Sequence, residues 1–219
     1  MSIRDERKQQ SRQALLDAAL ALSTSGRSFS SLSLREIARQ VGLVPTAFYR
    51  HFQDMNELGL ELVDQVALHL KGILHRLGQT YIAHPNTQAA ASLDLFFQAV
   101  EQNAEPWIFM IAERCGGAEL IRHAIAREIN FLIGDLTTDL RQIEIVKHIA
   151  NLHDLHILSD ILVNLSFTWA MTWMSIERQY QAEERCERQA QFKRQTLTQI
   201  NLIFRGILNW DSTPVSLNQ

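Results

Sequence analysis

The stretch SLREIARQVGLVPTAFYRHF, residues 33–52, decides what the sequence predicts for the fold. Ser33 is a favourable helix N-cap, and Glu36 three residues later completes a capping box. Gly42 can end this short helix, because glycine adopts the left-handed conformation of a helix C-terminus at no steric cost. Pro45 can open a second helix, since a residue of the first turn needs no N–H donor. Two short helices joined by a turn that contains glycine predict a helix-turn-helix.

The second of these helices has two faces of different character. Because successive helical residues are about 100° apart, Phe48 and Phe52 fall on one side and can anchor the helix. The opposite side is small, basic and rich in hydrogen-bonding groups: it carries Thr46, Ala47, Arg50 and His51, with Tyr49 on the flank. Such a face fits the major groove of DNA, where base edges offer acceptors and methyl groups and the rims carry phosphates.

Each position of this face has a group suited to one part of the duplex. Arg50 can donate to guanine O6 and N7, and Thr46 and Ala47 can touch a thymine methyl group. The phenol and the imidazole suit phosphates, as does the N-terminus of the preceding helix. The predicted DNA-binding residues are Ser33, Arg35, Thr46, Ala47, Tyr49, Arg50 and His51. The alternative is a helical hairpin inside an α-helical enzyme, with Arg50 simply solvated.

The rest of the sequence is also helical in pattern, so the predicted fold class is all-α. Alternating β-branched runs are nearly absent, whereas apolar residues recur at helical spacing. The clearest helical stretches are residues 11–22, a segment capped by Asp54 that ends before His84-Pro85, residues 155–178 and residues 193–210. Interruptions are expected at Gly116-Gly117 and in the polar stretches 141–155 and 179–192.

Charge divides the chain into two parts. Residues 1–52 carry eight basic and four acidic side chains, whereas the remaining 167 residues carry 13 basic and 20 acidic ones. A basic head on an acidic body suggests that the head meets a polyanion. We therefore expect a DNA-binding domain of three helices over residues 1–54, a larger helical domain over 55–212 and a disordered tail over 213–219.

The composition also bears on compartment and on chemistry. No apolar run reaches the roughly 18 residues of a membrane span, and the first residues, MSIRDERKQQSRQ, are polar, so neither a signal peptide nor an anchor is expected. Cys115 and Cys186 make no disulfide framework, which favours a reducing cytoplasm. Because no nucleophile elbow, phosphate loop or paired catalytic motif is present, we expect neither an enzyme nor a cofactor.

Two further groups of residues were weighed as chemical sites. The cluster of His148, His153, Asp154 and His156 lacks the spacing that places two imidazoles on one helical face, and it falls in an expected loop. We therefore predict no metal site. Cys115 stands beside Gly116-Gly117 without a second cysteine nearby, so a buried or idle thiol is a simpler interpretation than a redox centre.

Residues 33–64, SLREIARQVGLVPTAFYRHFQDMNELGLELVD, resemble the DNA-binding region of the TetR family of transcriptional regulators. The resemblance implies a homodimer that binds a palindromic operator through an N-terminal three-helix domain. It also implies a C-terminal domain that binds a small molecule and thereby releases the DNA. Family members often have a lysine at the start of the fourth helix, where its amine reaches phosphate. This chain has Met55 there, so Tyr49, His51 and the N-terminal bases would have to supply that contact.

A finer resemblance covers residues 27–64 and, more loosely, residues 113–136, which begin with ERCGG. Both stretches are similar to the FabR and DesT regulators of unsaturated fatty-acid synthesis and desaturation. This likeness implies a repressor of fatty-acid genes whose effector is a long-chain acyl-CoA or a related acyl thioester. Two alternatives stay open: a TetR-type regulator of efflux that responds to drugs, and an α-helical enzyme or scaffold that binds no DNA.

The body of the chain offers the residue types that an acyl ligand needs, namely an apolar lining and bases at its mouth. The predicted ligand-binding residues are Phe97, Trp107, Met110, Arg114, Phe131, Trp169 and Trp173. Aromatic residues at helical spacing are nevertheless more often core than ligand contacts. A helical dimer needs an apolar stripe on two helices, for which we assign Leu158, Leu165, Ile200 and Ile207.

Overall fold

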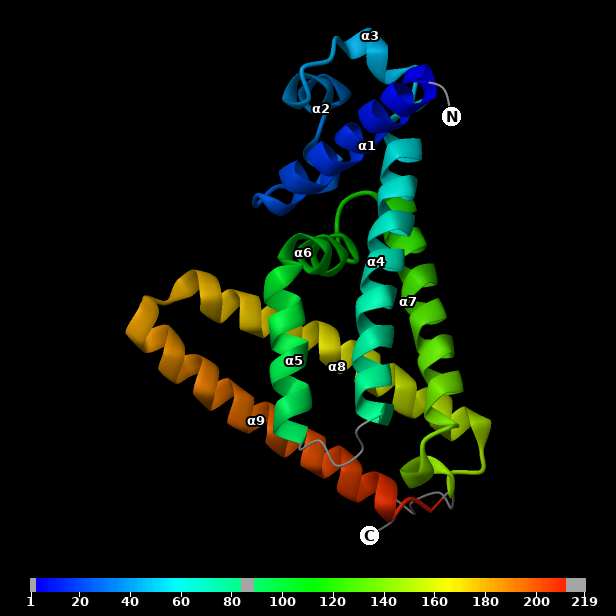
Figure 1. Ribbon diagram of the computed structural model, residues 1–219, viewed down its shortest axis with the longest axis vertical. Helices are drawn as coiled ribbons and strands as arrows, with labels where there is room; N and C mark the ends of the chain where they lie inside the picture. Colours follow the sequence, from blue (N-terminus) through cyan, green and yellow to red (C-terminus); the bar gives the residue numbers. More distant parts are fainter. Residues whose placement is uncertain (1–2, 84–88, 212–219) are drawn as a thin grey trace. The chain divides into compact units, whose positions relative to one another are not determined.

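The computed structural model describes residues 3–83 and 89–211. Within these residues the protein consists of α-helices and short 3-10 turns without any β-strand, which confirms the all-α prediction (Figure 1). In chain order the elements are α1 (Ile3–Thr24), η1 (Phe29–Ser31), α2 (Leu34–Gln40), α3 (Pro45–Phe48), α4 (Met55–Ala83), α5 (Ala89–Gln102), α6 (Ala104–Glu113), α7 (Glu119–Leu140), η2 (Glu144–Val146), α8 (Leu152–Gln179) and α9 (Ala182–Leu208). The tail predicted over residues 213–219 lies outside the described residues.

The chain forms two compact units, and each takes residues from two separate parts of the sequence. The first unit comprises the residues up to Gly72 together with Asn103–Glu128, and the second comprises Ile73–Gln102 together with the residues from Ile129 onward. Helices α4 and α7 therefore contribute residues to both units. The boundary predicted after residue 54 does not coincide with a boundary between these packing units, and as a division between functions it stays a prediction.

Local signals set the helix ends in the first unit. Ser33 Oγ accepts the Glu36 N–H at 3.3 Å, and Glu36 Oε2 accepts the Ser33 N–H at 3.3 Å, which confirms the capping box. Gly42 follows α2 with a φ of 71°, a left-handed conformation that glycine adopts without strain. Asp54 Oδ1 accepts the Glu57 N–H at 2.9 Å and caps α4 as expected.

The core of the first unit is built around α1, which packs against α2 and α6. Leu15 and Ala19 of α1 are fully buried, as are Ile37 of α2 and Trp107 and Met110 of α6. Full burial of one large apolar side chain contributes about 1.5–3 kcal/mol relative to exposure. The helix-turn-helix is thus supported by an apolar core that α6 shares.

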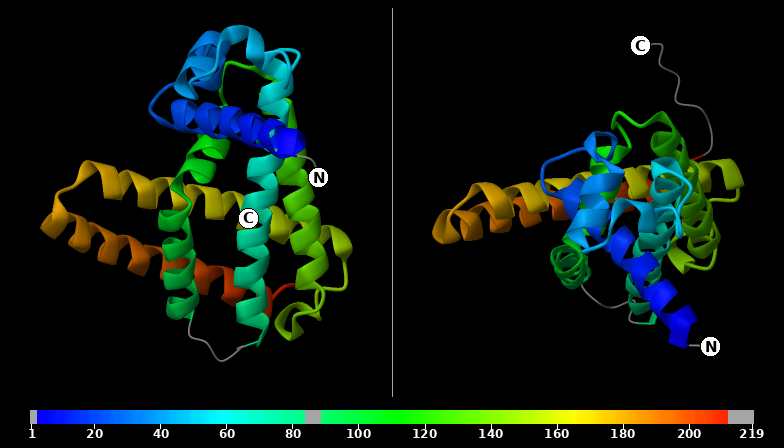
Figure 2. Two further views of the ribbon diagram at one scale, coloured as in Figure 1. Left: turned by 45° about the horizontal axis from the view of Figure 1, so that its top comes forward. Right: turned by 90° about the horizontal axis from the view of Figure 1, so that it is seen from above.

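The second unit contains the antiparallel hairpin of α8 and α9, against which α5 packs (Figure 2). Phe97 of α5 stacks on Trp173 of α8 with ring centroids 4.1 Å apart, and Phe192 of α9 lies 5.8 Å from Phe97. Near the start of α8 and the end of α9, a second cluster consists of Leu140, Val146, Ile149, Leu155 and Ile207. Aromatic and aliphatic contacts therefore close the hairpin at different places.

Three helices begin earlier than their apolar patterns indicated. Helix α1 begins at Ile3, so the basic N-terminal arm is helical. Helix α8 begins inside the polar stretch 141–155, because the Asn151 side chain caps it. Helix α9 begins at Ala182, so most of the interruption predicted over 179–192 is helical. Glutamate, arginine and glutamine favour a helix even where no apolar face is present. The spacing of apolar residues therefore does not predict the first turns of α9.

Glu36 is expected to make the stability of the first unit pH-dependent. Arg27 first, and Ser33 second, lower the pKa of the Glu36 carboxyl from 4.5 to about 2. A carboxyl with a lowered pKa contributes its full stability above about pH 4.5 and loses that contribution as the pH falls through about 2. In thermal melts, Glu36→Gln should therefore unfold at a lower temperature than the wild type at neutral pH, and the difference should shrink in acid.

The matched control is Glu187→Gln, which removes an exposed acid on α9. Its melting temperature should stay close to that of the wild type across the same pH range. An equal dependence on pH in both variants would contradict the role given to the Arg27–Glu36 pair.

Candidate nucleic-acid interface

The predicted recognition helix is shorter than a regular helix. Helix α3 is a single turn, Pro45–Phe48, which the extended backbone of Val44 leads into. Beyond it, the N–H groups of His51 and Phe52 both donate to the Phe48 carbonyl, at 2.8 and 3.1 Å. The segment therefore consists of one α-helical turn followed by a tighter turn, and the faces predicted from an ideal helix apply only to its first part.

Two phenylalanines hold this segment against the rest of the first unit. Phe48 and Phe52 are buried, and their ring centroids lie 5.6 Å apart. The Arg12 guanidinium of α1 lies over the Phe52 ring, 4.1 Å from its centroid. Because this side of the segment is fixed by packing, the opposite side is presented to solvent.

The outward side carries most of the predicted DNA-binding residues. Thr46 and Arg50 are exposed, and Tyr49 is 64% exposed. An edge-to-face contact with Phe48, at 5.9 Å between centroids, orients the Tyr49 ring. Ala47 is half-buried beside the anchors. The placement suits a groove-facing surface, whereas contact with DNA stays a prediction.

Ser33 and Arg35, at the start of α2, are both exposed. The Ser33 N–H already donates to the Glu36 carboxylate, which also pairs with Arg27 at 2.7 Å. A phosphate at this helix terminus would meet that carboxylate, because both are anions that seek the same donors. The geometry therefore favours Arg35 over Ser33 as a phosphate contact.

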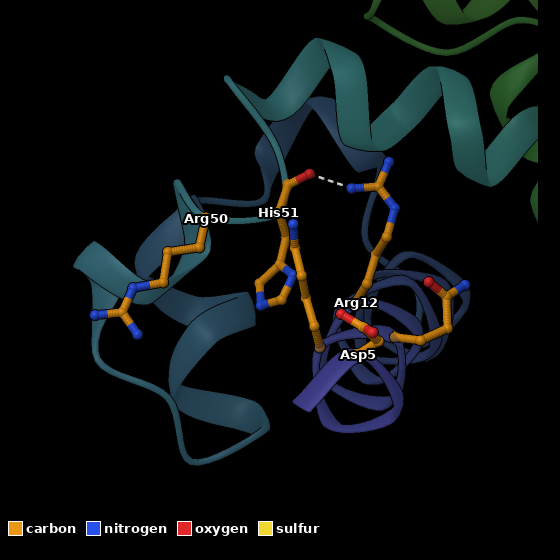
Figure 3. Close-up of a pocket in the computed structure, with 6 residues that line it drawn as sticks. Asp5, Arg12, Arg50 and His51 are labelled. Carbon is orange, nitrogen blue, oxygen red and sulfur yellow. Dashed lines mark hydrogen bonds between the residues drawn. The ribbon is translucent and has the colours of Figure 1, made fainter. Parts of the chain in front are cut away.

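His51 does not lie on the outward side as the ideal helix predicted. It is half-buried, and its carbonyl oxygen accepts a hydrogen bond from Arg12 Nη1. The physical reason is that the α-helix ends at Phe48, so the following turn rotates His51 toward α1. Figure 3 shows its imidazole between the side chains of Arg50 and Arg12.

This rotation creates a pocket that the sequence did not predict. Its volume is about 370 Å³. Its lining consists of Asp5, Lys8, Gln9, Arg12, Arg50 and His51. Burial first, and then the charges of Arg12, Lys8 and Arg50, lower the pKa of His51. Helix α1 begins at Ile3, so residues 5, 8, 9 and 12 lie on one of its faces. This spacing is the feature of the sequence that could have indicated the pocket.

In the second unit, the aromatic residues predicted to bind a ligand are in contact with other aromatic rings. Trp173 stacks on Phe97, and Trp169 meets Phe96 edge-on at 6.2 Å. Trp169 Nε1 donates to Gln199 at 2.7 Å, and Trp173 Nε1 donates to Glu101 at 2.8 Å. Such packing and bonds are typical of a core, and ligand binding by these residues stays a prediction.

The other predicted ligand residues are divided between the units. Trp107 and Met110 are fully buried in the first unit, where Arg114 is half-buried. Phe131 belongs to the second unit and is 58% exposed. Neither unit by itself assembles the seven predicted residues into one site.

Glu113, at the end of α6, was not among the predicted site residues. It is buried, and its Oε1 accepts the Phe29 N–H at 2.7 Å across a sequence separation of 84 residues. Its Oε2 is buried without a hydrogen-bond partner among the described residues. The contact ties the turn between α6 and α7 to η1, which leads directly into α2.

The apolar residues assigned to a dimer interface differ in their surroundings. Leu158, Leu165 and Ile200 are half-buried, whereas Ile207 is only 7% exposed and belongs to the aliphatic core of the second unit. Its own chain already covers the Ile207 side chain, and a role at a subunit interface stays a prediction for all four residues. The large apolar residues of the hairpin that are exposed are Leu152, Ile157, Ile161 and Met171 of α8 and Leu202 and Leu208 of α9.

The histidine cluster has local roles. His153, Asp154 and His156 belong to the first turns of α8 rather than to a loop. His148 Nε2 donates to the Ile207 carbonyl at 2.6 Å. In the part of the chain that the structure describes, no three His, Cys, Asp or Glu side chains are grouped so that they could hold a metal ion. Across residues 3–83 and 89–211, none of the helices combines the length and the apolar character needed to cross a membrane.

A helix-turn-helix in an all-helical chain, with a polar side facing out from a buried aromatic anchor, defines a DNA-binding protein of the helix-turn-helix class. Two family models match the sequence. Residues 15–62 match the bacterial regulatory proteins of the tetR family, and residues 85–198 match the tetracyclin repressor-like C-terminal domain. The chain belongs to the TetR family of transcriptional regulators. Such regulators bind operator DNA and small-molecule effectors and act as dimers.

Solved structures share the fold over nearly the whole chain. A TerR/AcrR-family regulator from Aquifex aeolicus VF5 is 16% identical, with a TM-score of 0.58 over 86% of this chain and 98% of that chain. NalD, the secondary repressor of the MexAB-OprM multidrug efflux pump in Pseudomonas aeruginosa, is 22% identical, with a TM-score of 0.59 over 94% and 100%. The fatty acid degradation regulator FadR from Bacillus halodurans is 12% identical, with a TM-score of 0.57 over 90% and 94%.

Glu113→Ala should destabilise the first unit. The substitution leaves the buried Phe29 N–H without an acceptor, which costs about 1–3 kcal/mol of the free energy of unfolding. Glu113→Gln retains a side-chain oxygen for that N–H and should cost less. Both values can be measured by urea denaturation followed by circular dichroism.

Glu187→Ala on α9 is the control, and it should change the free energy of unfolding by no more than about 0.5 kcal/mol because the side chain is exposed. Equal losses in the two Glu113 variants would show that the bond to Phe29 is not what the carboxylate contributes.

Proposed function

We propose that this chain is a homodimeric, cytoplasmic repressor that binds a palindromic operator and controls genes of unsaturated fatty-acid synthesis or desaturation. In this proposal residues 1–54 bind DNA, and residues 55–212 bind a long-chain acyl thioester and form the dimer. The observation that carries the DNA-binding part is the exposure of Thr46, Tyr49 and Arg50 above the buried Phe48 and Phe52. Residues of these types, held on a rigid turn, suit bases and phosphates of a major groove.

The hairpin of α8 and α9 supports the homodimer. Ile157, Ile161 and Met171 follow helical spacing along one side of α8, and Leu202 of α9 is 65% exposed. A second copy of the same surface would cover these side chains, at a gain of about 25 cal/mol for each Å² of apolar area buried. A twofold dimer then places two recognition segments on successive major grooves, about 34–36 Å apart.

The segment that resembles the FabR and DesT regulators, residues 113–136, supports an effector that acts through the turn between α6 and α7. This segment begins with Glu113, whose carboxylate holds the Phe29 N–H. A ligand that moves this turn would therefore also move η1 and α2. The coupling is a free energy of about 1–3 kcal/mol in typical cases, which corresponds to a change of roughly 5–150-fold in operator affinity.

A regulator of efflux is the second candidate. NalD, whose structure resembles this chain, represses a multidrug efflux pump, whereas FadR, which shares the fold at a lower sequence identity, is a fatty acid degradation regulator. The two candidates share the DNA-binding mechanism and differ in the chemistry of the effector. Residues 27–64, which resemble regulators of unsaturated fatty acids, favour the acyl thioester.

Arg50→Ala should weaken operator binding by about 1–3 kcal/mol at each half-site, the value of a bidentate contact with guanine. Tyr49→Phe removes a phosphate contact and should weaken binding without changing sequence preference. Gel shift with DNA fragments from the upstream region of the gene measures both effects. Arg178→Ala on α8 is the matched control, because it removes an exposed arginine from the second unit.

Unchanged binding in both Arg50→Ala and Tyr49→Phe would show that the recognition segment is assigned wrongly. The affinity of the wild type should also fall with salt, with a slope in log K of about 0.9 for each phosphate neutralised. A flat response to salt would contradict the DNA-binding proposal itself.

Long-chain acyl-CoA should change the affinity for the operator by roughly 5–150-fold, whereas hydrophobic cationic drugs should leave it unchanged. Fluorescence anisotropy with a labelled operator and a panel of both ligand types separates the two candidates. Native mass spectrometry of the purified protein should show a dimer and any acyl ligand that it carries. Release of DNA by the cations alone would favour the efflux regulator.

A further inference from the structure

The pocket between α1 and the turn after α3 contains cations that the packing of the first unit does not use. Arg12 already has partners within the first unit, because it donates to both carboxylate oxygens of Glu61 and to the His51 carbonyl. Lys8 and Arg50, by contrast, form no salt bridge with any residue that the structure describes. Two positive charges thus line a space open to an anion.

His51 adds a polar atom that also lacks a partner. Its Nδ1 is buried and accepts or donates no hydrogen bond among the described residues. Burial first, followed by the charges of Arg12, Lys8 and Arg50, lowers the pKa of the imidazole. An anion in the pocket would oppose these three charges and so favour the protonated ring.

The size of the pocket suits a phosphate group. Its volume is about 370 Å³. A phosphate with part of its hydration shell therefore fits, and the Gln9 side-chain amide is a further donor in the lining. The oxygens of a tetrahedral phosphate can accept hydrogen bonds from several directions at once. The lining offers donors from two directions, because it comes from α1 and from the turn after α3.

We propose that this pocket binds one phosphate of the operator backbone and that His51 takes up a proton as the phosphate enters. The inference rests on the proposed DNA-binding function. It adds Lys8 and Gln9 as phosphate contacts, and it adds the uptake of a proton by His51 on binding. It also supplies a phosphate contact to a chain whose fourth helix begins with Met55.

The charged groups that face His51 set the direction of the pH dependence. Lys8 and Arg12 of α1 and Arg50 of its own turn oppose protonation, whereas Asp5 of α1 and Glu61 of α4, the partner of Arg12, favour it. A bound phosphate shifts this balance toward the protonated form. The pKa of His51 should therefore be higher in the complex with the operator than in the free protein. As the pH falls through the interval between these two pKa values, operator affinity should rise.

The first experiment follows operator binding by fluorescence anisotropy at constant ionic strength. Wild type should bind about tenfold more tightly near pH 6 than near pH 8, with about threefold from each head of the dimer. His51→Gln can still donate a hydrogen bond but cannot titrate, so it should lose this dependence. His153→Gln removes an exposed histidine of α8 and should keep it.

The second experiment measures the charge and the source of the anion. Lys8→Gln should lower the slope of log K against log salt by about 0.9 for each head, whereas Arg178→Gln should leave it unchanged. Thermal melts verify that each variant is folded. The titration of the His51 ring is then followed by NMR in the free protein, with inorganic phosphate and with the operator, and the operator should raise its pKa.

Operator binding that does not depend on pH, or a wild-type salt slope in Lys8→Gln, would overturn the inference and leave the DNA-binding function standing. Failure of the wild type to bind any upstream fragment would instead contradict the proposed function. A His51 titration that inorganic phosphate shifts and the operator does not would assign the pocket to a free anion, and the inference would again be wrong.

Discussion

The guanidinium of Arg12 joins α1 to two later and neighbouring segments of the chain. It donates from Nε to Glu61 Oε1 at 2.9 Å, donates to Glu61 Oε2 and to the His51 carbonyl, and lies over the Phe52 ring. Helix α1, the turn after α3 and helix α4 therefore meet at one side chain. Because this ion pair is partly buried, loss of either partner would strand the other charge, which costs more than an exposed pair contributes. The direction in which the recognition segment faces depends on this junction.

Much of the fold could be predicted because its signals are local. Ser33 and Glu36 cap α2 through atoms three residues apart, Gly42 ends that helix by its own φ, and Asp54 caps α4. The two phenylalanines of the recognition segment follow from helical spacing and are buried as expected. Each of these signals is complete within one turn of chain, so no knowledge of the tertiary structure is needed to interpret it.

The candidate site could be predicted only in part, because its shape depends on distant contacts. His51 leaves the outward face since α3 ends at Phe48, and its carbonyl meets Arg12 across a separation of 39 residues. Ile207 has the spacing of an interface residue, yet the residues that cover it come from α7, η2 and α8. The helical spacing of apolar residues predicts that a residue faces an apolar neighbour. It does not predict whether that neighbour belongs to the same chain or to a second copy.

The link between Glu113 and Phe29 bears on how an effector signal would reach the DNA-binding residues. A side chain at Gly116 would overlap Glu113 Oε2, so the turn after α6 can approach the carboxylate this closely only with glycine there. The same carboxylate bonds the first N–H of η1, and η1 leads through Leu32 to the cap of α2. The turn after α6 is therefore linked to the segment that precedes the helix-turn-helix by a buried hydrogen bond to a carboxylate. Hydrogen bonds are directional, and they lose much of their strength when bent. A rotation of the turn that bends this hydrogen bond would therefore weaken the hold of Glu113 on Phe29.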